Sequence, residues 1–234
     1  TFTAPATVDS LSFVLTVTDD EGSTGSATIY VKTRAGSSNQ VFFSEYAEGS
    51  SNNKYLVIYN SSGASVALSA YSISTCNNGC DAAGEFDYPD NVTFAAGTVL
   101  AAGDVYVVCH GSASDEISAE CDQTFTYLSN GDDFQALTLA GATASSYTVI
   151  DQVGDWGDDP GDGWDVAGVT DGTMDHTLVR KSTVTSGSTD WSASAGTTTD
   201  NSEWIVLDQD TWAYVGSHPH TELEGPVPPT ISSI

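Results

Sequence analysis

Positively charged residues are scarce in this chain of 234 residues. Five Lys plus Arg stand against 32 Asp plus Glu, which gives a formal net charge of −27. Binding to a nucleic-acid backbone requires Lys and Arg to displace condensed counterions, so we expect no direct nucleic-acid binding by this segment. An acidic surface of this kind is typical of proteins from saline media, where ions screen its self-repulsion. We therefore expect a marine or otherwise saline bacterial source.

Long apolar runs and helical periodicity are also missing. No run approaches the roughly 18 apolar residues of a membrane helix, so we expect no membrane span. No signal peptide is recognisable, so we expect the segment to lie downstream of an export signal. The hydrophobic fraction of 39% is adequate for a packed core. Short alternating runs of β-branched and aromatic residues fill the chain, which predicts an all-β protein.

The cysteines are few but even in number. Cys76, Cys80, Cys109 and Cys121 lie in a Ser/Thr/Gly-rich, Lys-poor sequence, which indicates a secreted protein with two disulfides. Three pairings are possible. We predict Cys76–Cys80 and Cys109–Cys121, because each closes a short polar loop. A four-cysteine zinc site is the alternative, but the C-x3-C and C-x11-C spacings differ from paired C-x2-C knuckles.

Two pairs of strands can be predicted from local pattern. Val41–Phe43 and Tyr55–Tyr59 are strand-like runs joined by turn-forming residues 48–53, which predicts a hairpin. Residues 1–33 alternate in the same way around a turn at residues 19–22, which predicts a second hairpin. Two strands alone are marginally stable in water, so this N-terminal hairpin needs a partner sheet.

The segment 41–60, with its SEY, EGSSNNKYL and IYN, closely resembles the opening of the lamin tail domain. Later stretches continue the similarity: GTVLAAG followed by DVYVV, NGDD before ALTL, DHTLVRK, and a closing Trp204 and Gly216-Ser217-His218. One residue departs from the family, which usually has Glu where this chain has Val57. The resemblance implies an immunoglobulin-like β-sandwich over residues 41–219. It also implies a non-catalytic accessory, spacer or docking module of a large secreted or surface protein, as in extracellular nucleases.

The flanking segments indicate further modules. TFTAP, LTVTDDEGS and IYV in residues 1–33 resemble the last strands of a polycystic-kidney-disease-type immunoglobulin-like repeat, which implies a hairpin from a partial second β-sandwich. That hairpin would pack on neighbouring domains or on other copies of the chain. Residues 34–40 are predicted to be a linker. Residues 220–234 are predicted to be a Pro-rich linker and the start of a following module.

An acidic Gly/Pro loop is the candidate metal site. Its five carboxylates are Asp155, Asp158, Asp159, Asp162 and Asp165. Oxygen ligands on a flexible loop suit Ca²⁺, although the spacing does not match an EF-hand and a solvated acidic loop is the alternative. Asp132 and Asp133 are predicted to stabilise a turn by accepting hydrogen bonds from backbone N–H groups.

A catalytic role finds less support in the sequence. Asp175, His176, Arg180 and Ser217-His218 form no recognisable nucleophilic motif, and we expect Asp175 and Arg180 to form a structural ion pair. Five tryptophans in the last eighty residues offer a glycan-binding face or, alternatively, core packing. The leading interpretation is thus a non-catalytic module; the alternatives are a calcium- or glycan-binding adhesion module and a metal-assisted hydrolase.

Overall fold

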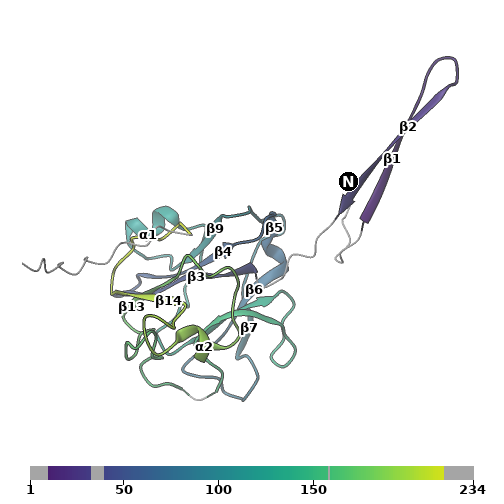
Figure 1. The fold of residues 1–234 in the computed structure, drawn as a ribbon. Helices are drawn as coiled ribbons and strands as arrows, with labels where there is room; N and C mark the ends of the chain where they lie inside the picture. Colours follow the sequence, from purple (N-terminus) through teal and green to yellow (C-terminus); the bar gives the residue numbers. More distant parts are fainter. Residues whose placement is uncertain (1–9, 33–39, 158, 219–234) are drawn as a thin grey trace, which may run out of the picture. The chain divides into compact units, whose positions relative to one another are not determined.

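The computed structural model describes residues 10–32, 40–157 and 159–218. The chain divides into two compact units, Thr1–Ser38 and Asn39–Ile234. The first unit contains one antiparallel hairpin of β1 (Ser10–Thr18) and β2 (Thr24–Lys32), as the sequence predicted (Figure 1). Asp19 Oδ1 accepts hydrogen bonds from the backbone N–H groups of Glu21 and Ser23, at 3.1 and 2.7 Å, and these bonds fix the turn.

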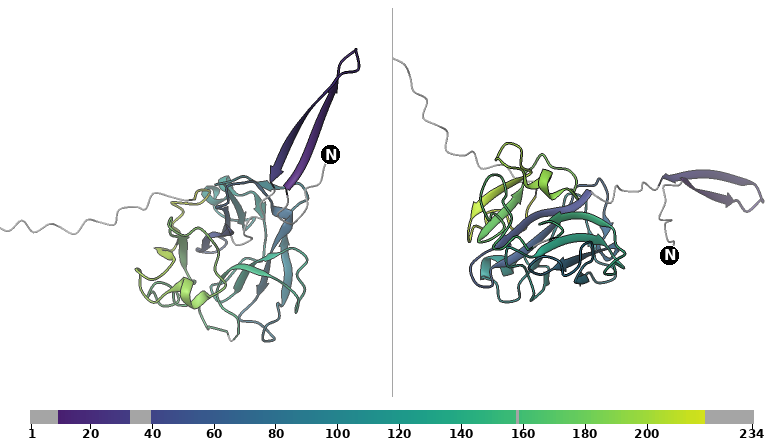
Figure 2. Two further views of the ribbon diagram at one scale, coloured as in Figure 1. Left: turned by 45° about the vertical axis from the view of Figure 1, so that its right-hand side comes forward. Right: turned by 90° about the horizontal axis from the view of Figure 1, so that it is seen from below.

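The second unit is built on two main sheets that face each other, antiparallel except for the short parallel pair β9–β10 (Figures 1 and 2). The larger sheet has the strand order β10-β9-β4-β3-β13-β14, and the smaller has the order β12-β11-β6-β7. The strands of the larger sheet are β3 (Val41–Glu48), β4 (Lys54–Asn60), β9 (Val105–Cys109), β10 (Gln123–Thr124), β13 (His176–Arg180) and β14 (Trp204–Asp208). Those of the smaller are β6 (Tyr71–Cys76), β7 (Tyr88–Thr93), β11 (Phe134–Leu139) and β12 (Val149–Val153).

Only short elements supplement the sheets. A two-stranded ribbon pairs β5 (Val66–Ala67) with β8 (Val99–Leu100), and the 3-10 helix η2 (Leu68–Ala70) follows β5. The α-helices are α1 (Asp115–Glu120) and α2 (Trp191–Ala195). The predicted fold class, an all-β immunoglobulin-like sandwich, is confirmed. The predicted hairpin at residues 41–60 is the pair β3–β4, in the middle of the larger sheet.

Strands β3 and β4 are buried along their whole length. One face packs into the main core between the sheets, where Phe43 and Ile58 meet Ile73 and Leu137 of the smaller sheet. The other face lies in a second cluster that includes Val57 and, from α1, Ile117. Burial on both faces explains why these strands read as nearly continuous apolar runs. Val57, the departure from the family pattern, belongs to the second cluster and is fully buried.

The four cysteines form two disulfides, Cys76–Cys80 and Cys109–Cys121. This pairing is the one predicted from the sequence, in preference to the other two and to zinc. Cys109 ends β9 and Cys121 follows α1, so the second bridge ties α1 to the larger sheet. A bridge closing a loop of this length contributes about 3 kcal/mol in the chain-entropy model.

Candidate functional site

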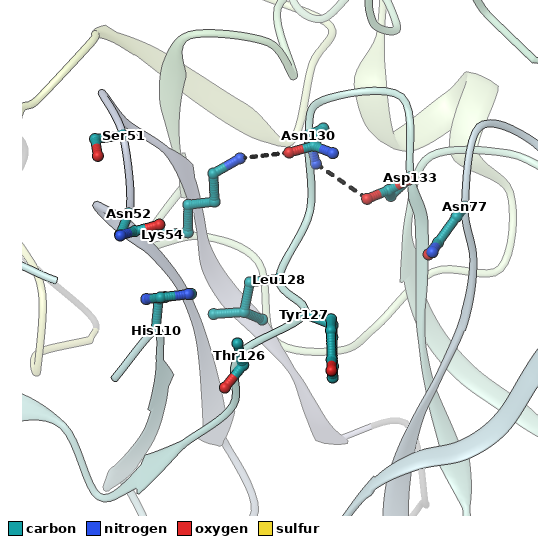
Figure 3. A pocket seen from close by; sticks show the side chains of 10 residues that line it. All are labelled: Ser51, Asn52, Lys54, Asn77, His110, Thr126, Tyr127, Leu128, Asn130 and Asp133. Atoms are coloured by element: carbon teal, nitrogen blue, oxygen red, sulfur yellow. Dashed lines mark hydrogen bonds between the residues drawn. The ribbon is translucent and has the colours of Figure 1, made fainter. Parts of the chain in front are cut away.

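Polar groups from different family motifs surround a hollow of about 290 Å³, called here the Lys54 pocket (Figure 3). Its walls come from the β3–β4 turn, the ends of β6 and β9, and the segment before β11. The lining residues are Ser51, Asn52, Lys54, Asn77, His110, Thr126, Tyr127, Leu128, Asn130 and Asp133. The EGSSNNKYL and NGDD motifs, far apart in the sequence, thus meet at one place.

Among the described residues, Lys54 is the only Lys or Arg that lines this pocket, and its donors are used within the fold. Its Nζ donates to Glu48 Oε1 at 3.1 Å, to Ser129 O at 2.5 Å and to Asn130 Oδ1 at 2.8 Å. The side chains of Lys54 and Glu48 are each only 10% exposed. An ammonium group has three donors, so these partners account for its capacity. Lys54 therefore joins the two motifs and has no donor left for a ligand.

The carboxylates beside Lys54 are also engaged. Glu48 Oε2 accepts from the backbone N–H of Asp175 at 3.1 Å, which brings in the DHTLVRK motif. Asp133 accepts from the N–H groups of Asn78 and Asn130, each at 3.0 Å, which confirms its predicted turn-stabilising role. Burial raises the pKa of Glu48 and of Asp133, and Lys54 opposes both shifts.

Arg180 forms a second polar cluster in the core. Its Nη2 donates to both carboxylate oxygens of Asp151 at 2.9 Å, its Nη1 pairs with Glu203, and its Nε donates to Phe43 O at 3.3 Å. The guanidinium lies 4.0 Å from the ring centroid of Trp204. Arg180 and Asp151 are fully buried. The predicted Asp175–Arg180 pair is wrong, because the guanidinium pairs instead with Asp151, on β12 of the smaller sheet, and with Glu203, directly before β14.

Asp175 and the histidines have other partners. Asp175 accepts from the side-chain amide of Gln209, and His176 Nδ1 lies 2.5 Å from Met174 O. Ser217 Oγ donates to Tyr214 O at 3.0 Å rather than to a histidine. His218 is buried edge-on against the ring of Tyr59, with the centroids 4.6 Å apart. Each of these residues therefore has a structural contact within the fold.

One buried carboxyl was not predicted from the sequence. Glu45 on β3 is fully buried; Tyr55 Oη donates to its Oε2 at 2.8 Å, while its Oε1 has no hydrogen-bond partner among the described residues. Burial raises the pKa of Glu45 from 4.5 to about 8, and the Tyr55 hydrogen bond offsets part of this rise. The one available signal was a Glu inside an otherwise apolar strand.

The acidic loop does not gather its described carboxylates into one cluster. Within residues 10–32, 40–157 and 159–218, no group of three or more His, Cys, Asp or Glu is placed to hold a metal ion. Asp155 and Asp159 instead accept from nearby backbone N–H groups, those of Trp156 and Gly161. Asp165 similarly accepts from Asp171, Asp162 is exposed, and Asp158 lies outside the described residues. The Ca²⁺ site stays a prediction.

That prediction has a thermal test. If the loop binds Ca²⁺, adding about 1 mM Ca²⁺ should raise the melting temperature, because binding to the folded state alone adds RT ln(1 + [L]/Kd). The double variant Asp158→Asn, Asp159→Asn should lose that rise, whereas the exposed Asp200→Asn should keep it. An unchanged melting temperature in the wild-type chain would contradict the prediction.

The tryptophans serve packing. All five are buried or half-buried in the described part of the chain. Trp156, from the acidic loop, lies 4.6 Å from Phe86 and 4.7 Å from Phe134 between ring centroids. Trp212 lies edge-on to Tyr55 at 5.8 Å. Core packing, one of the two roles that the sequence left open, therefore accounts for these side chains.

Comparison with known families gives one match. The model of the lamin tail domain matches residues 34–157, more than half of the chain. No curated protein and no solved structure gives a significant match. None of the described helices has the length and apolar character to cross a membrane. With the two-sheet sandwich and the motifs at the Lys54 pocket, this match shows that the chain belongs to the lamin tail domain family.

Proposed function

We propose that this lamin tail domain is a non-catalytic accessory module, a spacer or docking unit, of a large secreted or surface protein. One observation carries the proposal: the two buried cations of the family motifs hold the fold together. Lys54 uses its donors on Glu48, Ser129 and Asn130, and Arg180 is buried against Asp151 and Glu203. General acid–base or electrophilic catalysis needs such groups to face a substrate.

The proposed location and medium follow from the disulfides and the net charge. Two disulfides favour an oxidising, extracellular location. The net charge of −27 favours a saline medium, in keeping with a marine bacterial source. The proposed parent is an extracellular nuclease, the class that the sequence resemblance suggests. In such a parent, another module would supply the phosphate contacts that this one lacks.

The N-terminal hairpin is proposed to pack on neighbouring domains or on other copies of the chain, as the end of a second sandwich. Val14 and Val17 on β1 are 62% and 61% exposed, and two strands alone are marginal in water. Sedimentation of the full chain should show concentration-dependent association that Val14→Lys with Val17→Lys abolishes. A monomer at all concentrations would exclude pairing of copies.

The nuclease question has a direct assay. The full chain, incubated with DNA, Mg²⁺ and Ca²⁺, should neither cut nor retard DNA at any ionic strength. Hydrolysis needs a cation clamp on the phosphate and an activated water, and repulsion by the −27 charge is strongest at low salt, where screening is weakest.

The alternative, a metal-assisted hydrolase, makes the opposite prediction. Turnover that survives repurification and is lost in Asp175→Asn or His176→Gln would overturn the non-catalytic proposal. Turnover that these substitutions leave unchanged would also overturn it, and would locate the active site elsewhere in the chain.

A further inference from the structure

Two tyrosines stand out among the exposed side chains. Among the described residues, Tyr127 is 77% and Tyr88 is 49% exposed, and the other large exposed hydrophobic side chains are aliphatic. Exposed single aliphatic residues are ordinary, but two exposed aromatic rings at one place are characteristic of binding surfaces. Both tyrosines line one groove of about 330 Å³, together with Asn77 and Asn91.

The groove stands on rigid elements. Tyr88 begins β7 and pairs with Thr75 of β6 across the smaller sheet. Asn91 Nδ2 donates to Thr75 Oγ1 at 2.8 Å, which orients the amide. On the other side, the ring of Tyr127 packs edge-on to Phe125, with centroids 6.0 Å apart. These contacts set the groove before any ligand arrives, which lowers the entropic cost of binding.

We propose that this groove is a binding site for a neutral oligosaccharide. The C–H face of a pyranose ring packs well on a tyrosine ring, whose face is electron-rich. Asparagine amides offer both donors and acceptors, which suits the hydroxyl groups around a sugar ring. The described lining of the groove, Tyr88, Tyr127, Asn77 and Asn91, supplies both kinds of contact and carries no charged side chain.

The neighbouring Lys54 pocket extends the site. The two hollows share Asn77 and Tyr127, which Figure 3 shows in the wall of the Lys54 pocket. A chain of sugar rings that leaves the groove between Tyr88 and Tyr127 therefore enters the Lys54 pocket. There it meets further neutral amide and hydroxyl groups, among them Asn52 and Thr126. A Pro-rich peptide would use the aromatic rings but would leave most of these polar groups unpaired. Sulfated or carboxylated glycans are opposed by the net charge of −27.

The test uses the full chain and four neutral probes: cellohexaose, laminarihexaose, xylohexaose and chitohexaose. Titration followed by calorimetry and ligand-observed NMR should show binding of at least one probe below about 5 mM, the range of a weak but specific site. Tyr88→Ala and Tyr127→Ala should each weaken it at least about tenfold, because each removes one stacking face. Tyr88→Phe and Tyr127→Phe keep the rings and should stay within about threefold of the wild-type affinity.

The controls separate sugar binding at this groove from non-specific adsorption and from peptide or polyanion binding. Val99→Ala, another exposed hydrophobic position, should bind as the wild-type chain does. A decaproline peptide, heparin and DNA should not bind. The proposal is overturned if no neutral hexasaccharide binds, if the Tyr88→Ala, Tyr127→Ala double variant binds as tightly as the wild-type chain, or if only the peptide or an anionic polymer binds. These outcomes do not depend on whether the parent is a nuclease.

Discussion

Arg180→Met should lower the free energy of unfolding by about 3–5 kcal/mol at pH 7, because it leaves a buried carboxylate without its cation. Asp151 is fully buried, and the guanidinium supplies two of its hydrogen bonds. The backbone N–H groups of Phe43 and Ser188, each at 2.8 Å, would remain as its donors. Methionine fills much of the volume, so the loss measures the missing charge more than a cavity. Urea denaturation measures this loss in the free energy of unfolding, provided that the m-value is the same for both proteins.

The adjacent residue provides the control. Lys181 is half-buried and donates at the surface to Thr199 O, and Lys181→Met should change the unfolding free energy by less than about 0.5 kcal/mol. The double variant Arg180→Met, Asp151→Leu should recover a large part of the loss, because it removes the unpaired charge. A loss below about 1 kcal/mol for Arg180→Met would contradict the assigned role.

Glu45→Gln should stabilise the protein at pH 8–9 by roughly 3–5 kcal/mol and should change little at pH 4. The folded pKa of Glu45 is raised to about 8, against an ordinary value of 4.5. Between these values the folded chain keeps a proton that the unfolded chain releases. Wild-type stability therefore falls as pH rises from 4.5 to 8, while below 4.5 both states are protonated. Glutamine imitates the neutral acid and removes this pH-dependent loss.

The measurement is the free energy of unfolding at four or five pH values. An exposed carboxylate, Glu116, gives the matched control, and Glu116→Gln should follow the wild-type curve. Because Tyr55 Oη donates to Glu45, Tyr55→Phe should lower stability further at high pH, where the ionised carboxylate has lost its donor. Parallel curves for the wild-type chain and Glu45→Gln would show that Glu45 does not titrate as the burial implies.

Local pattern was sufficient to predict two hairpins. The hairpins β1–β2 and β3–β4 depend on alternation and turn residues within about twenty positions. The partners of the buried charged side chains could not be predicted from local pattern. Arg180 meets Asp151 because β12 of the smaller sheet packs against β3, the strand that pairs with β13, and the separation of 29 residues carries no such information.

Burial was the other quantity that the sequence could not supply. The run of residues in β3 does not show that both of its faces are covered, but Ile117 of α1 and Trp212 pack in the cluster on the outer face, and Glu45 is fully buried. The sequence left open an exposed surface of tryptophans beside an acidic loop, whereas the large exposed aromatic side chains among the described residues are Tyr88 and Tyr127. A sequence shows which side chains are aromatic, but only packing decides which of them meet solvent.

The central claim is that the two buried cations of the family motifs, Lys54 and Arg180, hold the fold together and do not serve a ligand. Lys54→Met tests it most directly, with Lys181→Met, at the surface, as the control. Urea denaturation should show a loss of about 2–4 kcal/mol for Lys54→Met, because Glu48, Ser129 O and Asn130 lose their shared donor, and almost none for the control. Unchanged or increased stability of Lys54→Met would contradict the claim and would mark Lys54 as a residue retained for binding or catalysis.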